Sequence, residues 1–139
     1  MIASGLLFAL VAMVAYAFWA IGAEMATRTL APEIVAFITY STGAVLFSGY
    51  LFVRPEPVEM PPIGTAFGFA LATGAIMCIG TLTYYRGLQF GDPTAVTTIA
   101  AMYFVLAALL DIMLLGNPLS TTDAIGLALA ALAVTFIAV

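Results

Sequence analysis

Residues 2–23 read IASGLLFALVAMVAYAFWAIGA, a run without a single charged side chain. A helix needs about 20 mostly apolar residues to cross the roughly 30 Å hydrocarbon core of a bilayer. Further runs of this kind have the approximate bounds 33–53, 62–85, 93–115 and 120–139. No stretch shows the sustained alternation of a barrel strand. The sequence therefore predicts an all-α integral membrane protein, with one domain over 1–139 folded as a bundle of five transmembrane helices.

The composition excludes most other classes of protein. Charged residues make up 7% of the chain, against roughly 25% in soluble domains. The net charge of −4, with no Lys, offers no basic surface to nucleic acid. With no His and one Cys there is no Cys/His metal site and no His-based catalytic triad. We therefore expect neither an enzyme nor a cofactor-binding protein.

The three arginines bear on orientation in the membrane. No Lys or Arg precedes the first apolar run, so we expect that helix to be retained rather than cleaved as a signal peptide. Five spans place Arg54 on the N-terminal side and Arg28 and Arg86 on the other, which is almost no bias. Two interpretations remain open. One orientation is selected during folding, or copies insert both ways and pair as an antiparallel dimer that reproduces the inverted repeats of transporters.

Few ionisable residues lie near or within the spans, and each is a functional hypothesis because burying charge in a bilayer is costly. Asp111 lies about one turn inside the fourth span and either pairs with Arg54 or couples transport to protons. Glu24 and Arg86 are expected to close the first and third helices on the same side of the membrane. They form either an ion pair across the bundle or a charged gate.

Aromatic and hydroxyl side chains suggest a polar cavity. Tyrosines deep in a membrane need hydrogen-bond partners, whereas those near helix ends are typical of the interfacial belt, to which we assign Tyr50, Tyr84 and Tyr85. Helical spacing also places Thr97 and Asp111 on one face of the fourth span. The candidate cavity residues are Tyr16, Trp19, Tyr40, Thr97 and Tyr103.

A longer pattern joins the third and fourth spans. The run 84–96, YYRGLQFGDPTAV, resembles the Y-x-x-A-L-x-x-G-P-x-x-A junction of EamA-type proteins in the drug/metabolite transporter superfamily. Residues 114–119, LLGNPL, are similar to the L-x-G-E-x-L of that family, and 18–20, FWA, to its early aromatic-Trp-Gly. The chain departs from the family at Asn117, where the family has Glu, and near Met102, where a proline is usual.

The resemblance implies a single-repeat transporter in the cell membrane of a prokaryote. Such a chain is expected to work as an antiparallel homodimer among membrane lipids, moving an unidentified small molecule by alternating access, with proton coupling at Asp111 or Glu24. The alternative is a non-transporting accessory subunit, or a half-transporter that needs a different partner. A small multidrug-resistance type of exporter is disfavoured, because Glu24 lies at a helix end and a fifth helix is present.

Overall fold

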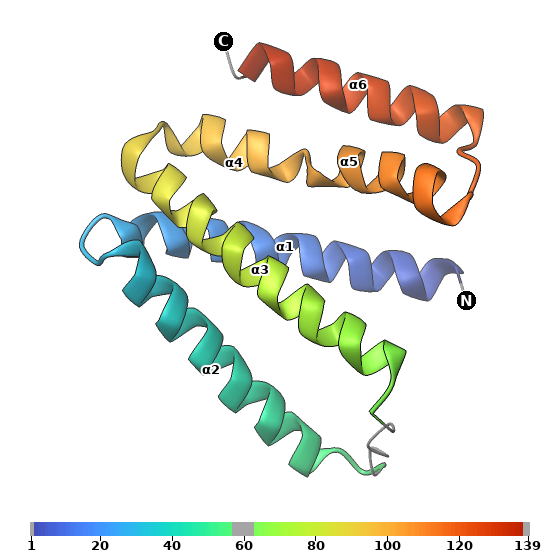
Figure 1. Cartoon of the computed structure of the whole chain (residues 1–139). Coiled ribbons are helices and arrows are strands. Elements are labelled where there is room, and N and C mark those ends of the chain that lie inside the picture. Colours follow the sequence, from blue (N-terminus) through green and yellow to red (C-terminus); the bar gives the residue numbers. More distant parts are fainter. Residues whose placement is uncertain (1, 57–62, 138–139) are drawn as a thin grey trace. The chain divides into compact units, whose positions relative to one another are not determined.

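The computed structural model describes residues 2–56 and 63–137, and every regular element in that part of the chain is helical (Figure 1). The elements are α1 (Ile2–Thr27), α2 (Pro32–Val53), α3 (Thr65–Phe90), α4 (Pro93–Ala101), α5 (Tyr103–Leu110), the π-helix η1 (Asp111–Leu115) and α6 (Thr121–Ile137). Four helical stretches are long and apolar enough to cross a membrane, ending with Pro93–Leu115, and α6 is a shorter apolar helix of 17 residues. The predicted fold class is confirmed. The end of the fifth predicted helix, 138–139, lies outside the described residues.

Two helices continue beyond the ends that hydropathy predicts. α1 runs to Thr27 and α3 to Phe90, so that Glu24 and Arg86 lie inside their helices rather than at the ends. Hydropathy indicates which residues cross the apolar core of the membrane. The helix itself continues beyond that core until the helical backbone is interrupted. The interruption comes at Pro32 after α1 and at Pro93 after α3, since the residue before a proline disfavours the helical conformation.

The fourth predicted helix is interrupted at Met102 instead of running unbroken to Leu115. Met102 has φ −65° and ψ −4°, and its N–H donates to the carbonyl of Ile99 at 3.0 Å, a bond over three residues in place of four. The helix resumes as α5 and then widens into η1. Methionine is a good helix former, so nothing local in the sequence predicts this break.

Local caps delimit the helices in the second half of the chain. Asp92 accepts a hydrogen bond from the Ala95 N–H at 2.8 Å and begins α4. Gly116 ends η1 with φ 70°, the left-handed conformation that favours glycine. Ser120 Oγ accepts from the Asp123 N–H at 3.1 Å, and Asp123 Oδ2 accepts from the Ser120 N–H at 3.2 Å, which is a capping box.

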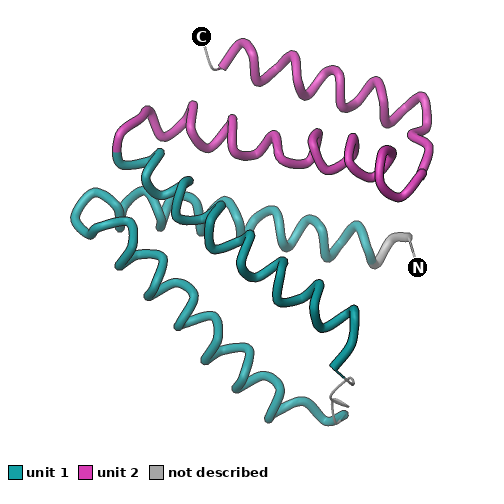
Figure 2. Tube along the Cα trace, in the orientation of Figure 1, with its two compact units in different colours: residues 1–89 teal, residues 90–139 magenta. Residues whose placement is uncertain are grey.

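The chain divides into two compact units, residues 1–89 and 90–139 (Figure 2). Unit 1 contains α1, α2 and α3, and its small core lies where the last turns of α1 and α3 meet the first turns of α2. The buried hydrophobic residues are Ala23, Val35, Tyr85 and Leu88. Most other large apolar side chains are exposed, as a chain surrounded by lipid requires; Phe52 is 89% exposed.

Unit 2 contains the remaining helices. The turn 116–120 reverses the chain direction, and α6 then lies against α4 (Figure 2). α4 carries small residues, Ala and Thr, and α6 is rich in Ala, a composition typical of helices that pack closely in a membrane.

Candidate functional site

The clearest polar feature of unit 1 joins the middle of α2 to α3. The Tyr40 hydroxyl donates to the Met77 carbonyl at 2.9 Å and also contacts Thr81 Oγ1. Since one hydroxyl has one proton, Thr81 is the donor in the second bond. Tyr40 lies eight residues after Pro32, about 12 Å along the helix, so this network is well inside the membrane.

A second hydroxyl contact lies beside the first. Thr39 Oγ1 and the Tyr85 hydroxyl are 3.2 Å apart, and the Tyr85 side chain is completely buried. The assignment of Tyr85 to the interfacial belt is therefore wrong. Its position near the end of the third apolar run suggested contact with headgroups, but three helices converge there and enclose the ring.

An ion pair lies on the same side of unit 1 as the α1–α2 turn. Arg86 Nη2 lies 2.6 Å and Nε 3.2 Å from Glu33 Oε1, which links α3 to the first turn of α2. The expected pair of Arg86 with Glu24 is not formed. Glu24 instead accepts from Arg28 Nη2 at 2.6 Å, one turn along α1. Arg28 is only four residues from Glu24 and reaches it without any packing between helices. Arg86 pairs with Glu33 instead.

Trp19 lies in an aromatic cluster. Its ring stacks on Tyr84 with centroids 5.3 Å apart, and it approaches Tyr85 at 6.0 Å. Beside the cluster is a cavity of about 230 Å³, here named the Trp19 hollow, which is open to the surroundings and contains no charged side chain. Its lining includes Trp19, Gly22 and Ala23 of α1, Ile38 and Thr39 of α2 and Tyr85 of α3.

A second cavity, of about 310 Å³, adjoins the other side of α2 and is here named the Cys78 hollow. It is lined by Glu33, Phe37, Tyr40 and Ser41 of α2 and by Cys78 and Leu82 of α3, with Ala36. Unlike the Trp19 hollow, it is lined by a charged side chain, that of Glu33. Thr39 belongs to one hollow and Tyr40 to the other, so the two cavities lie on different sides of α2.

The predicted cavity residues are distributed over both units. Trp19 and Tyr40 line hollows in unit 1, whereas Tyr16 lines neither and is 64% exposed. Thr97 lies in α4 and Tyr103 is the first residue of α5, directly after the Met102 interruption. Two of the five predicted cavity residues, Trp19 and Tyr40, thus line cavities, and both belong to unit 1.

The predicted acid of the fourth span lies in an unusual element. Asp111 begins η1, and its Oδ1 accepts from Asn117 Nδ2 at 3.1 Å. π-helical turns occur frequently at functional sites. Arg54 caps α2 and lies 3.9 Å from Glu56, and its proposed pairing with Asp111 stays a prediction.

Several functional candidates were missed from the sequence: Glu33, Thr39, Thr81 and Tyr85. Glu33 has an ordinary explanation as an acid in the first turn of a helix. Thr81 and Tyr85 are one turn apart on α3 and share a face with Cys78, a stripe that would have identified the side turned to α2.

Comparison with known proteins identifies the family of this chain. The EamA-like transporter family matches residues 3–139, which is almost the whole sequence. The chain belongs to the EamA-like transporter family. No curated protein and no solved structure is significantly similar to it. The resemblance drawn from the junction at 84–96 is therefore confirmed.

Membership of the EamA family agrees with the apolar helices in indicating an integral membrane protein. Members of the EamA family are transporters rather than enzymes. Among residues 2–56 and 63–137, no three Asp, Glu or Cys side chains converge as metal ligands. The chemistry available in unit 1 is that of hydroxyl groups, aromatic rings and an ion pair, which suits binding of a solute.

Proposed function

We propose that this chain is one subunit of a secondary transporter for small organic molecules, with the Trp19 hollow as part of the substrate path. The observation that carries the proposal is a cavity lined by the Trp19 and Tyr85 rings and the Thr39 hydroxyl, which extends to Leu30 in the turn between α1 and α2. Polar groups are costly inside a bilayer and mark substrate pathways there. The hollow suits a solute with an apolar body and a hydrogen-bonding group.

Gly22 offers a direct test of the path. A Cβ added at Gly22 meets nothing within 4 Å, and the residue lines the Trp19 hollow. Gly22→Ala is therefore expected to transport normally and Gly22→Phe, which fills the hollow, to stop transport. Gly5→Phe on the same helix is the matched control, since Gly5 also has open space around it.

The assay uses purified protein in liposomes with a pH gradient and a panel of labelled amino acids, nucleosides and aromatic amines. Uptake that Gly22→Phe removes and Gly5→Phe retains supports the proposal. A folded protein that moves no member of the panel contradicts it. Equal uptake by both phenylalanine variants places the path elsewhere.

Asp111 is proposed as the residue that couples transport to protons. Its partner Asn117 is a neutral amide, whereas Glu24 is already bound to Arg28. A carboxylate within a membrane-spanning segment is costly and marks ion pathways, proton relays among them. Asp111→Asn is expected to abolish uptake driven by a pH gradient while leaving counterflow, and Glu24→Gln to retain both. If neither variant changes the response to the gradient, proton coupling is contradicted.

The assembly is proposed to be an antiparallel homodimer that works by alternating access. The near-even division of the three arginines supports insertion in both orientations. Reporter fusions to the C-terminus, one active only in the cytoplasm and one only outside it, are both expected to give signal. One fixed orientation would contradict the antiparallel homodimer and favour a half-transporter with a different partner.

A further inference from the structure

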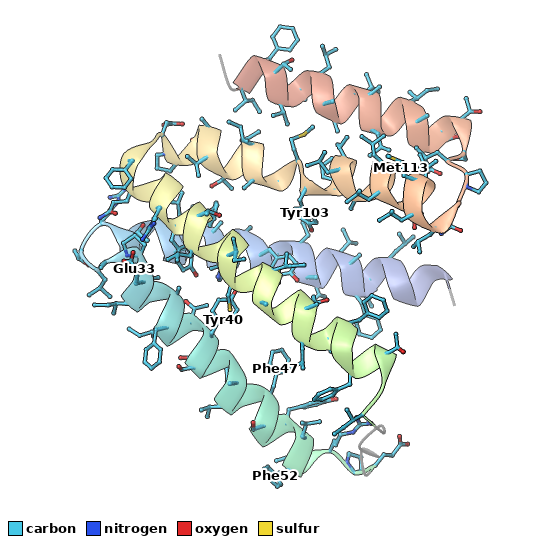
Figure 3. The ribbon with its side chains drawn as sticks, in the orientation of Figure 1. Glu33, Tyr40, Phe47, Phe52, Tyr103 and Met113 are labelled. Carbon is cyan, nitrogen blue, oxygen red and sulfur yellow. The ribbon has the colours of Figure 1, made fainter. Side chains whose placement is uncertain are left out.

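The polar contacts between α2 and α3 are all gathered in one half of the helix pair. On α2 they come from Glu33, Thr39 and Tyr40, within its first nine residues. On α3 they come from the middle of the helix onward: Met77, Thr81, Tyr85 and Arg86. Figure 3 shows Glu33 and Tyr40 on the half of α2 nearest the α1–α2 turn, and Phe47 and Phe52 on the other half.

These contacts form rungs in the order expected of antiparallel helices. Arg86–Glu33 lies at the outer end, Tyr85–Thr39 comes next, and Thr81–Tyr40 with the Met77 carbonyl is the deepest. Glu33 and Tyr40 are two helical turns apart, about 10 Å along the axis. The rungs therefore extend from the end of the helices towards the middle of the membrane.

The other half of the pair differs. Among the described residues, no hydrogen bond or ion pair links Ser41–Val53 to the first half of α3. Its large side chains are exposed: Phe47 is 74% and Phe69 is 70% exposed. Apolar contacts between helices in lipid have no hydrophobic driving force, so this half is held together less strongly than the rungs.

The two hollows lie on either side of the rungs. Thr39 and Tyr85 line the Trp19 hollow, whereas Glu33 and Tyr40 line the Cys78 hollow. The Thr39–Tyr85 and Tyr40–Thr81 contacts lie between them. The hydroxyl network is thus the partition between them.

We propose that the rungs Glu33–Arg86, Thr39–Tyr85 and Tyr40–Thr81 form a latch that closes the transporter at the end bearing the α1–α2 turn. The role of the latch as a gate depends on the proposed transport function. Opening it breaks only hydrogen bonds and an exposed ion pair and no covalent bond, so that it is reversible. The structure shows it closed.

The native Cys78 reports on the latch without any knowledge of the substrate. It is the only cysteine in the sequence, and it lies in the Cys78 hollow. The probe is a charged, membrane-impermeant methanethiosulfonate, which reacts only with a thiol that water reaches. The rate of labelling is measured on the full chain in lipid nanodiscs, where both membrane faces are open to the reagent.

Thr81→Val removes one bond of the deepest rung and is expected to raise the labelling rate about threefold, the effect of losing one typical hydrogen bond between membrane helices. Tyr40→Phe also removes the bond to the Met77 carbonyl and is expected to raise the rate further. The double variant gives no further gain over Tyr40→Phe, because that substitution already removes the bond to Thr81. Thr83→Val is the matched control, since Thr83 bonds only to the carbonyls of Ile79 and Gly80 in its own helix. Its labelling rate is expected to stay at that of the wild type.

The charged rung has its own control. Arg86→Gln breaks a contact between α3 and α2, whereas Arg28→Gln breaks one between α1 and the turn that directly follows it. Only the first is expected to speed labelling, and Glu33→Arg combined with Arg86→Glu is expected to return it to the wild-type rate. Rates that are unchanged in Tyr40→Phe, Thr81→Val and Arg86→Gln, or equally raised in the controls, overturn the latch.

A cross-link completes the test. Ser41 and Cys78 line the same hollow from facing helices, so Ser41→Cys allows a short bifunctional thiol reagent to join α2 to α3. Locking is expected to stop uptake of a panel solute, and a reductant that cleaves the linker to restore it. Transport that continues through the locked protein overturns the gate. Labelling that responds in a protein moving no solute supports the latch and overturns the transport role, so the two failures are distinguishable.

Discussion

Arg86 on α3 reaches Glu33 at the first turn of α2, with its Nη2 2.6 Å from Oε1 and 53 residues of chain between them. Both side chains are about half exposed, so solvent screens the attraction. The pair therefore contributes orientation more than stability. It sets which turns of α2 and α3 face each other, and so brings Tyr40 opposite Thr81 two turns deeper.

Exchange of these two charges is the first prediction. Glu33→Arg alone places two guanidinium groups side by side and is expected to lower the thermal unfolding temperature in detergent micelles. Arg86→Glu alone is expected to do the same through two carboxylates. The double exchange should recover the wild-type temperature, and a double variant no better than the worse single variant would show that the contact does not form.

The N-cap of α4 provides a second prediction. Asp92→Ala removes the acceptor of the Ala95 N–H and is expected to cost about 1 kcal/mol of unfolding free energy. Asp92→Asn keeps an acceptor oxygen and should cost much less. Unfolding of both variants in the same micelles measures the difference, and equal losses would assign the effect to the negative charge instead of the cap.

Gly116 gives a third prediction, because its φ of 70° is left-handed. An L side chain pays roughly 1–2 kcal/mol there, so Gly116→Ala is expected to destabilise unit 2 by that amount. Asn adopts this conformation more readily, and Gly116→Asn should be milder. Gly74→Ala is the control: it lies within α3 with open space around it, and alanine there should be neutral or stabilising. A loss at Gly74 as large as that at Gly116 would contradict the conformational explanation.

The interruption at Met102 gives a fourth prediction. Its φ of −65° is that of proline, and its N–H makes no bond to the carbonyl four residues earlier. Met102→Pro is therefore expected to cost less than the about 3 kcal/mol typical of a helix interior. Ala107→Pro, in the middle of α5, should cost the full amount. Circular dichroism during thermal unfolding compares the two, and equal losses would show that α4 and α5 form one continuous helix.

Some residues of the candidate site could be predicted from the sequence, and others could not. Trp19 and Tyr40 were predicted as cavity residues and line hollows. Glu33 and Thr81 were missed because an acid in a first turn and a threonine in an apolar helix both have ordinary explanations. Tyr85 was assigned to the membrane interface, since a position along the chain does not tell whether other helices enclose a side chain.

The sequence by itself determined what depends on neighbouring residues and on the surrounding solvent. A chain with 7% charged residues must be covered by lipid, and its apolar runs must be helical because every backbone group needs a partner there. The caps at Asp92, Gly116 and Ser120 likewise involve residues only a few positions apart. Family membership follows from the same pattern of residues.

The tertiary structure alone decided which helix faces meet. Arg86 binds Glu33 rather than Glu24, and Tyr40 meets Thr81, because the rotation and register of α2 against α3 bring those atoms together. Hydropathy carries no information on rotation in a helix that is apolar all round. The latch and the two hollows therefore arise from packing, whereas the membrane-spanning helices arise from composition.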